Sequence, residues 1–224
     1  MSKPADTVSG TEANAASTVS PENAPSHLLF DLGGVIVELD GHPIEPAWIR
    51  GERTSEEIWR LWLMSRAPRE FESGRSAPED FAREIVAELD LDVTPETFLA
   101  RFERLPLGPF PGALDLLHAL KGRYRTGIFS NSNTLHWPRK MGEMRLDDAV
   151  HDHFASHLIG HAKPGPDGFE HVRRCWNVDP GRILFLDDNA LNVEAGHAAG
   201  FRAERVNGLD ETRQALTRHG VHWA

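Results

Sequence analysis

The sequence predicts an α/β fold in which a Rossmann-like parallel sheet carries helices on both faces and an all-helical segment is inserted. Short apolar runs at 28–30, 126–130 and 183–186 have the composition of strands buried on both sides. Helical patterns alternate with strand patterns in the second half of the chain, an order typical of a parallel sheet covered by helices. The alternation is absent between about residues 41 and 109, which indicates the insertion.

The beginning of the chain differs in composition from the rest. Residues 1–26 are mainly Ala, Ser, Thr, Pro, Asn and Glu, with few apolar side chains. Such a segment buries too little surface to offset the entropy lost on ordering, so we predict a disordered tail. We expect a Rossmann-like core built from 27–40 and 110–224, with 41–109 as the helical insert.

Helix-start signals support an all-helical insert. Thr54 and Glu57 have the spacing of a capping box before an apolar helical pattern, and Ser76 and Glu79 repeat that spacing. The Thr-Pro pair at 94–95 predicts the start of a third helix, with Pro95 at its first position. We see no strand-like run between these signals, and we expect a hairpin or flap at 35–39, just before the insert.

The remaining elements of the core are predicted from periodicity and from turn residues. Gly200, for example, is well placed to end a helix, because glycine is favoured just past a helix end. The predicted helices are 113–120, 166–176, 192–199 and 210–219, and the further predicted strands are 156–159 and 201–206.

Composition and charge exclude several classes of function. The chain has 24 Lys and Arg against 34 Asp and Glu, and its net charge of −10 disfavours sequence-independent binding of nucleic acid. With one cysteine, Cys175, no intrachain disulfide and no thiolate metal cluster can form. No apolar run approaches the ~20 residues of a membrane helix, and no secretory signal is recognisable. We therefore expect a cytoplasmic protein; its oligomeric state is not indicated by the sequence.

Polar residues follow three of the predicted strands at the point where each strand ends. They are Asp31, the pair Ser130 and Asn131, and the pair Asp187 and Asp188. The carboxyl ends of parallel strands meet at one edge of the sheet, where ligands bind in such folds. Three carboxylates brought together repel one another, so we expect a compensating cation, and Mg²⁺ prefers oxygen ligands.

These residue types suit phosphoryl transfer. A carboxylate such as Asp31 beside Mg²⁺ can attack phosphorus and form an aspartyl-phosphate, while Ser130 and Asn131 supply hydrogen-bond donors. Lys163 lies just before a predicted helix N-terminus, where anions are favoured. Each feature alone is a common turn or cap residue; the prediction depends on their occurrence together and in this order.

Four segments resemble, in order, the motifs of the haloacid dehalogenase-like hydrolase superfamily: LLFDLGGV, FSNSN, AKPGPDGFEHV and ILFLDDNALNVEAGHAAG. The fourth is the most specific, and the resemblance covers about residues 27 to 206. FESGRSAPEDFAREIVAEL is similar to the helical cap of one large group of these enzymes, and we use "cap" for residues 41–109 from here on. SNSNTLHW and FDLGGVIVELD are similar to bacterial phosphatases that act on glucose 1-phosphate.

The resemblance implies a Mg²⁺-dependent phosphatase that acts on a small phosphorylated metabolite such as a sugar phosphate. It also implies a role for each matching position. These roles are Asp31 as nucleophile and metal ligand, Asp188 as metal ligand, Asp187 as ligand through water or partner of Lys163, Asn192 as support for the metal ligands, and Ser130, Asn131 and Lys163 as phosphoryl-binding residues.

One position departs from the family pattern. Most phosphatases of the family carry a second Asp two residues after the nucleophile, as general acid and base, and this chain has Gly33 there. The Gly33 carbonyl can face the metal, but it cannot protonate a leaving oxygen. Such general acid catalysis raises the rate by about 10²–10⁴-fold. Three accounts stay open: a leaving group that needs no proton, an acid from elsewhere such as the cap, or no phosphate hydrolysis at all.

Two alternative functions follow from that departure. The founding dehalogenases of the family also lack this Asp, but they need no metal and usually replace the acidic pair of the fourth motif. Retention of Asp187 and Asp188 therefore favours Mg²⁺ and phosphate over dehalogenation of 2-haloacids. The second alternative is a non-catalytic relative that binds a phosphate ligand.

Other residue groups are interpreted mainly as structural. His136 follows the second motif closely, and we consider it as a substrate-binding residue or as the missing acid. The histidines between 151 and 161 are expected on an ordinary surface rather than in a metal site. For the cap we expect tryptophans in its core, with a minority lining a pocket, and solvated arginines; these are Trp48, Trp59, Trp62, Arg66, Arg69 and Arg75.

Overall fold

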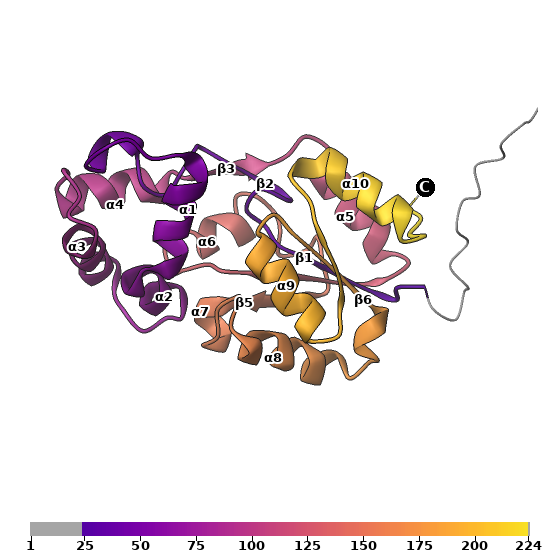
Figure 1. Ribbon diagram of the computed structural model, residues 1–224. Coiled ribbons are helices and arrows are strands. Elements are labelled where there is room, and N and C mark those ends of the chain that lie inside the picture. Colours follow the sequence, from indigo (N-terminus) through magenta and orange to yellow (C-terminus); the bar gives the residue numbers. More distant parts are fainter. Residues whose placement is uncertain (1–23, 224) are drawn as a thin grey trace, which may run out of the picture.

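A five-stranded parallel sheet forms the centre of the molecule in the computed structural model, which describes residues 24–223 (Figure 1). Most of the predicted disordered tail, residues 1–23, lies outside the described residues. The strand order is β5-β4-β1-β6-β7. The strands are β1 (His27–Phe30), β4 (Arg125–Ser130), β5 (Asp152–Ala155), β6 (Ile183–Asp187) and β7 (Arg202–Arg205).

The direction of chain progression reverses at β1. The chain passes from β1 to β4 and outward to β5, then returns to β6 on the other side of β1. Phe30 is in register with Ile128 of β4 and with Leu186 of β6, so the three strands end side by side. This reversal creates the crevice in which open sheets bind ligands.

The two faces of the sheet are buried under different helices, because successive strand residues point to opposite sides. Leu28 and Phe30 pack under α5 (Ala113–Lys121) and α10 (Gly208–Arg218), whereas Leu29 packs under α8 (Pro166–Trp176) and α9 (Ala190–Ala198). This arrangement confirms the predicted Rossmann-like class. Within residues 24–223, no helix combines the length and the apolar character needed to cross a bilayer.

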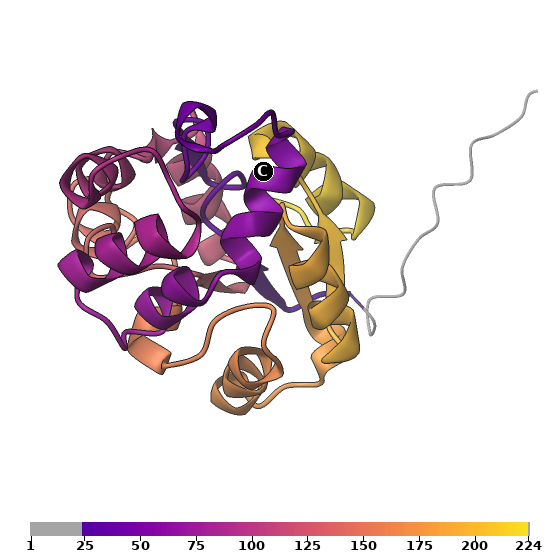
Figure 2. The ribbon, with the colours of Figure 1, turned by 60° about the vertical axis from the view of Figure 1, so that its left-hand side comes forward.

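The helices of the cap gather beyond the carboxyl edge of the sheet (Figures 1 and 2). Their apolar side chains form a cluster of their own, from Ile44 to Leu105, in which aromatic rings such as Phe71 and Phe81 stack. The helices are α1 (Ser55–Met64), α2 (Arg66–Glu72), α3 (Pro78–Glu88) and α4 (Pro95–Glu103), after a 3-10 turn at Pro46–Trp48.

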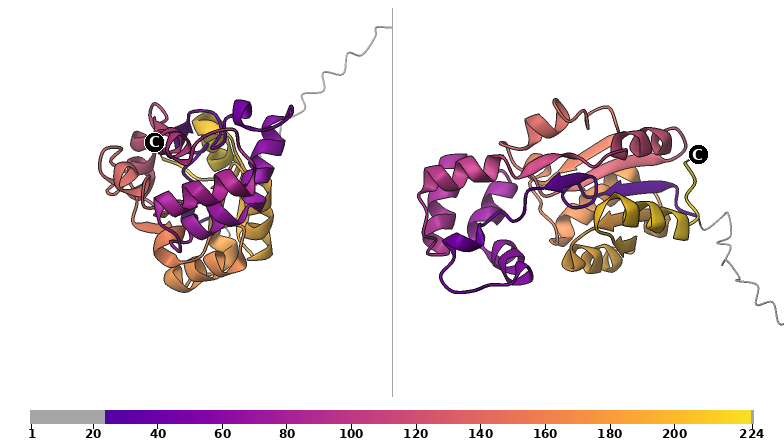
Figure 3. Two further views of the ribbon diagram at one scale, coloured as in Figure 1. Left: turned by 90° about the vertical axis from the view of Figure 1, so that its left-hand side faces the viewer. Right: turned by 90° about the horizontal axis from the view of Figure 1, so that it is seen from above.

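A two-stranded antiparallel ribbon joins the cap to the core, and it corrects the expectation of an insert without strands. The strand β3 (Pro106–Pro109) pairs with β2 (Val37–Leu39), and both connecting segments run side by side in Figure 3. The sequence pattern missed this pairing because the partners are about 70 residues apart and each strand is short. The local hairpin expected at 35–39 is wrong, because β2 pairs with the distant strand β3 and not with a neighbouring segment.

Two other local expectations are wrong. Residues Ser156–Ile159 form the helix α7, and the strand lies just before them, at Asp152–Ala155. Short apolar runs fit the periodicity of a helix and that of a strand equally well. Here the hydroxyl of Ser156 accepts a hydrogen bond from the backbone N–H of Ser132 and donates one to its carbonyl oxygen. The second capping box also fails, because the N-cap of α3 is Ala77 and not Ser76, whereas the Thr54 box forms as predicted.

Candidate active site

Three carboxylates meet at the carboxyl edge of the sheet. Asp31 directly follows β1, Asp187 is the last residue of β6, and Asp188 comes next. One oxygen from each lies within 4.8 Å of the others. Asp31 and Asp187 are buried, and Asp188 is half-buried. The structure therefore brings together all three acidic residues that the strand-end pattern selected.

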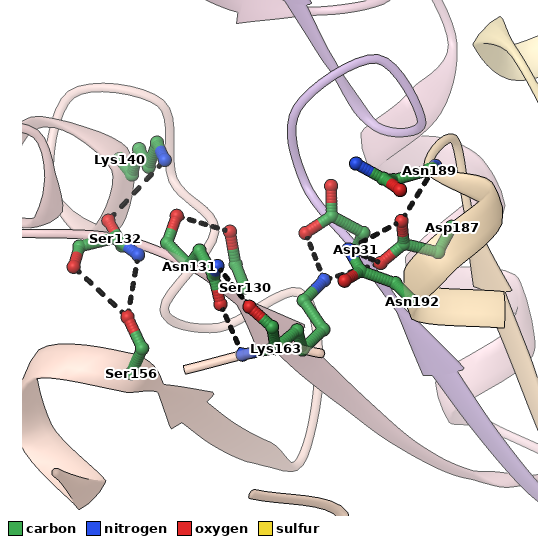
Figure 4. Close-up of polar contacts among 10 residues, drawn as sticks. All are labelled: Asp31, Ser130, Asn131, Ser132, Lys140, Ser156, Lys163, Asp187, Asn189 and Asn192. Atoms are coloured by element: carbon green, nitrogen blue, oxygen red, sulfur yellow. Dashed lines mark hydrogen bonds and ion pairs between the residues drawn. The ribbon is translucent and has the colours of Figure 1, made fainter. Parts of the chain in front are cut away.

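Lys163 lies between two of these carboxylates (Figure 4). Its Nζ donates to Asp31 Oδ1 at 2.7 Å and to Asp187 Oδ2 at 2.5 Å. The ammonium also lies over the rings of Phe129 and Phe185, 5.3 and 5.4 Å from their centroids. Burial opposes the charge, but the carboxylates of Asp187 and Asp31 outweigh it and raise the pKa of Lys163. Lys163 is therefore a fixed cation at neutral pH.

The charges of the site do not balance without a further cation. Three carboxylates face one ammonium, which leaves two negative charges if all are ionised. Burial, together with the charges of Asp31 and Asp187, raises the pKa of Asp188 to about 8. Burial also raises the pKa of Asp187. A divalent cation with oxygen ligands would neutralise this group, so the residues present fit Mg²⁺.

Amide groups hold Asp187 in place. Its Oδ1 accepts hydrogen bonds from the backbone N–H of Asn189, at 2.9 Å, and from Asn192 Nδ2, at 3.0 Å. Asn192 Oδ1 is buried with no hydrogen-bond partner within the described residues. This oxygen is a hydrogen-bond acceptor, and a water molecule bound to a metal ion would be a suitable donor to it. The expected supporting role of Asn192 is consistent with these contacts.

The turn after Asp31 depends on glycine. Gly34 has a φ of +70°, and a Cβ at this position would lie 2.6 Å from Asp188 Oδ2. A side chain there is therefore excluded by conformation and by space. Gly33, the position of the missing family Asp, lines the cavity described below and carries no side chain that can move a proton.

Ser130, the last residue of β4, and Asn131, which follows it, contact different groups. Ser130 is buried, and it lines the cavity together with Asn131. The side-chain amide of Asn131 is engaged by the backbone of Lys163: Nδ2 donates to its carbonyl at 2.9 Å, and Oδ1 accepts from its N–H at 2.8 Å. Asn131 therefore positions Lys163, and its backbone N–H is the group that suits a phosphoryl oxygen.

A cavity of about 990 Å³ opens above these residues, between the core and the cap. This volume is at the upper end of the range for small-molecule sites, about 300–1,000 Å³. The core contributes Asp31, Lys163 and Asp188, and the cap contributes Trp59 and Trp62. Trp62 also packs in the cap core, whereas Trp48 packs on Phe98, as expected for most of the tryptophans.

His136 joins the core to the cap. Its Nε2 lies 2.8 Å from the carbonyl oxygen of Phe102 in α4, and its Nδ1 faces Asn133 Nδ2 at 3.3 Å. Burial, with a contribution from Lys140, lowers the pKa of His136 to about 3. The neutral ring lines the cavity, but it holds no transferable proton beyond the one it gives to Phe102. This geometry opposes the acid role considered for His136.

The other histidines and the cap arginines have ordinary surroundings. His151 contacts Thr126, and His153 contacts the carbonyl of Leu146. Within residues 24–223, the aspartates described above are the one group of His, Cys, Asp or Glu placed to hold a metal. Arg66 and Arg75 pair with half-buried cap glutamates, and Arg69 contacts a backbone carbonyl.

Two cavity-lining residues were not identified from the sequence. Glu72, on α2 of the cap, and Lys140, on α6 (Trp137–Met141) of the core, face the same cavity as Asp31. Burial raises the pKa of Glu72 to about 7 and lowers the pKa of Lys140 to about 8. No local pattern distinguishes them, since each occurs in a helix rich in charged residues.

The motif order, the sheet and the acidic site define a class of protein. Residues 25–200 match the model of the haloacid dehalogenase-like hydrolases, and the chain belongs to that family. The expected family membership and hydrolase class are thereby confirmed.

Known relatives include a D-ribitol-5-phosphate phosphatase from Bacteroides thetaiotaomicron, 27% identical over 202 residues that cover 85% of this chain and 96% of the relative. An (S)-2-haloacid dehalogenase from Pseudomonas is 25% identical over 185 residues, which cover 82% of this chain and 77% of the relative. A crystal structure of a family enzyme from Bacteroides thetaiotaomicron, in complex with magnesium and inorganic phosphate, covers 81% of this chain and 93% of its own, with a TM-score of 0.63. At 23% identity, this last likeness shows the fold alone.

Proposed function

We propose that this protein is a Mg²⁺-dependent phosphomonoesterase that acts on a small, hydroxyl-rich phosphate ester through an aspartyl-phosphate on Asp31. The observation that carries the proposal is the buried group of three carboxylates and Lys163 at the floor of a cavity of about 990 Å³. The acid excess of this group is electrostatically costly without a cation. A phosphatase of D-ribitol 5-phosphate among the relatives supports this substrate class.

The chemistry begins with a fixed nucleophile. Lys163 holds one oxygen of the Asp31 carboxylate, so that the side chain needs no reorientation before attack. An Asp31 oxygen forms a bond to phosphorus while the bond from phosphorus to the leaving oxygen breaks. Water then attacks phosphorus, the bond to Asp31 breaks, and inorganic phosphate and the free carboxylate result.

The charge on the phosphoryl oxygens needs stabilisation at both steps. Lys163, the Ser130 hydroxyl and the backbone N–H of Asn131 line the same part of the cavity and suit these oxygens. When bound by Asp31, Asp187 and Asp188, Mg²⁺ supplies further positive charge to the phosphoryl group. Enclosure by the cap excludes bulk water, which strengthens these interactions.

The acidic pair argues against dehalogenation as the main activity. A carbon–halogen displacement requires no metal, so it gives no reason for two further carboxylates beside the nucleophile. The similarity to a haloacid dehalogenase concerns the shared fold and the attacking Asp.

A substrate screen tests the proposal. We expect phosphate release from sugar and polyol phosphates in the presence of Mg²⁺, loss of that activity in excess chelator, and no halide release from 2-haloacids. Asp31→Asn should reduce turnover by at least about 10³-fold, as loss of a nucleophile does. Asp167→Asn, at an exposed residue of α8, is the matched control and should keep wild-type turnover.

Three results would contradict the proposal. They are full phosphatase activity in Asp31→Asn, chelator-insensitive release of halide, and binding of phosphate esters with no turnover of even acetyl phosphate. The last result would identify a non-catalytic relative.

A further inference from the structure

The proposed reaction needs a proton at the leaving oxygen, and the core offers none at the family position. Gly33 lies there, with no side chain. An alkoxide is a poor leaving group, and general acid catalysis is worth about 10²–10⁴-fold for such a step. A donor must line the same cavity as Asp31. His136, Lys140 and Glu72 are titratable residues that line this cavity, and the charges of Lys140 and Glu72 interact with that of Asp31.

Two of these three residues are poorly suited. The His136 ring is neutral and gives its N–H to the carbonyl of Phe102. Lys140 contacts Ser132 Oγ at 3.4 Å, and with a pKa of about 8 it is mostly charged at neutral pH. A charged ammonium attracts an anionic substrate, but it cannot accept a proton from water in the second step.

Glu72 is fixed at the seam between the cap and the core. It is the last residue of α2, and its side chain is half-buried and lines the cavity. Gly74, two residues later, packs closely against α7. A Cβ at this position would lie 2.7 Å from the backbone carbonyl oxygen of His157. The end of α2 thus lies against the core, and Glu72 lines the same cavity as Asp31.

The groups around Glu72 keep both of its protonation states accessible. Burial raises its pKa to about 7, and the nearby charge of Asp31 acts in the same direction. Lys140 on α6, the Trp62 indole on α1 and Lys163 favour the charged form and oppose this shift. A group that is half-protonated near neutrality serves equally well as acid and as base.

We propose that Glu72 is the general acid and base of the reaction and that the cap thereby supplies the group that is missing at Gly33. In the first step, the Glu72 carboxyl proton passes to the leaving oxygen as Asp31 bonds to phosphorus, and an alcohol is released. In the second step, the Glu72 carboxylate takes a proton from the attacking water, and inorganic phosphate and the protonated carboxyl are restored. The inference rests on the proposed function.

Single-turnover kinetics on two substrates tests this inference. Glu72→Gln keeps the size and polarity of the side chain but removes its proton. With an alkyl phosphate such as glycerol phosphate, we expect the first step to slow by about 10²–10⁴-fold. With p-nitrophenyl phosphate, whose leaving group needs no proton, we expect a burst of p-nitrophenol at the wild-type rate. The slow second step then makes the phosphorylated enzyme accumulate.

Matched variants separate the outcomes. Glu79→Gln, at an exposed cap glutamate on α3, should leave both substrates at the wild-type rates, and unchanged binding of inorganic phosphate shows that Glu72→Gln is folded. The inference is overturned if Glu72→Gln slows both bursts equally, slows neither, or if Lys140→Met gives the leaving-group-selective loss instead. None of these results changes the role of Asp31 in the wild-type enzyme. If the proposed function itself is wrong, Asp31→Asn retains its activity.

Discussion

At the scale of single residues, the site is defined by one cation among three anions. Lys163 is buried between Asp31 and Asp187, and removal of one partner from a buried ion pair typically costs about 3–5 kcal/mol. Asn131 fixes the backbone of Lys163, and Asn192 fixes Asp187. Asp31, the proposed nucleophile, is thus oriented by groups that are themselves held, which is the condition for preorganised catalysis.

Gly34 provides a residue-scale test of the metal site. Gly34→Ala would place a Cβ 2.6 Å from Asp188 Oδ2, and Asp188 must move away. We expect Mg²⁺ affinity to fall by about 10–100-fold, the range for disturbed ligand support. Isothermal titration calorimetry measures this affinity directly.

Gly160→Ala is the matched control for Gly34→Ala. Gly160 has a φ of +77°, close to that of Gly34, but no atom lies within 4 Å of its Cβ position. Both variants carry the same backbone strain, and the steric contact is specific to Gly34. Equal Mg²⁺ affinity in the two variants would show that Asp188 is not a ligand.

At the scale of elements, His136 joins the loop after β4 to α4 of the cap through its hydrogen bond with the carbonyl oxygen of Phe102. Its pKa of about 3 lies below the ordinary 6.5, so between these values the unfolded chain binds a proton that the folded chain excludes. The free energy of unfolding therefore falls as the pH drops from 6.5 toward 3, by at most about 1.4 kcal/mol per pH unit from this residue. The contribution is fully present above pH 6.5.

Urea unfolding across this pH range tests the link. His136→Gln keeps an N–H donor but does not titrate, so we expect its stability deficit relative to wild type to shrink as the pH falls below 6.5. His222→Gln, at an exposed residue, should follow the wild-type curve. A deficit for His136→Gln that is constant with pH would mean that His136 is not buried in its neutral form.

Elements also show which parts of the fold can be predicted from sequence. The strands β1, β4 and β6 contain continuous apolar runs with polar ends, and this local pattern suffices to predict the centre of the sheet and the meeting of Asp31 with Asp187 and Asp188. The β2–β3 ribbon depends on pairing between distant segments and has no local signal. Glu72 was missed for the same reason, because its position at the cavity depends on how α2 packs against α7.

At the scale of the whole molecule, the cap and the core are two packed bodies with separate apolar clusters, joined by the β2–β3 ribbon. The ribbon lies near the boundaries predicted from the sequence, between 40 and 41 and between 109 and 110, and this division into cap and core stays a prediction. The cavity lies between the bodies: the core contributes Asp31, the proposed nucleophile, and the cap contributes Trp59 and Glu72. If Glu72 is the acid and base, as we propose, the reaction requires the cap to lie against the core.

In the proposed reaction, Asp31 carries the phosphoryl group during turnover. Mass spectrometry of the peptide that contains Asp31, after acid quench of a reaction run in heavy-oxygen water, tests this role directly. We expect a phosphoryl group on Asp31 and heavy oxygen in the released phosphate, because water attacks phosphorus. A phosphoryl group on another residue, or heavy oxygen in the Asp31 carboxylate after attack at carbon, would show that Asp31 does not have this role.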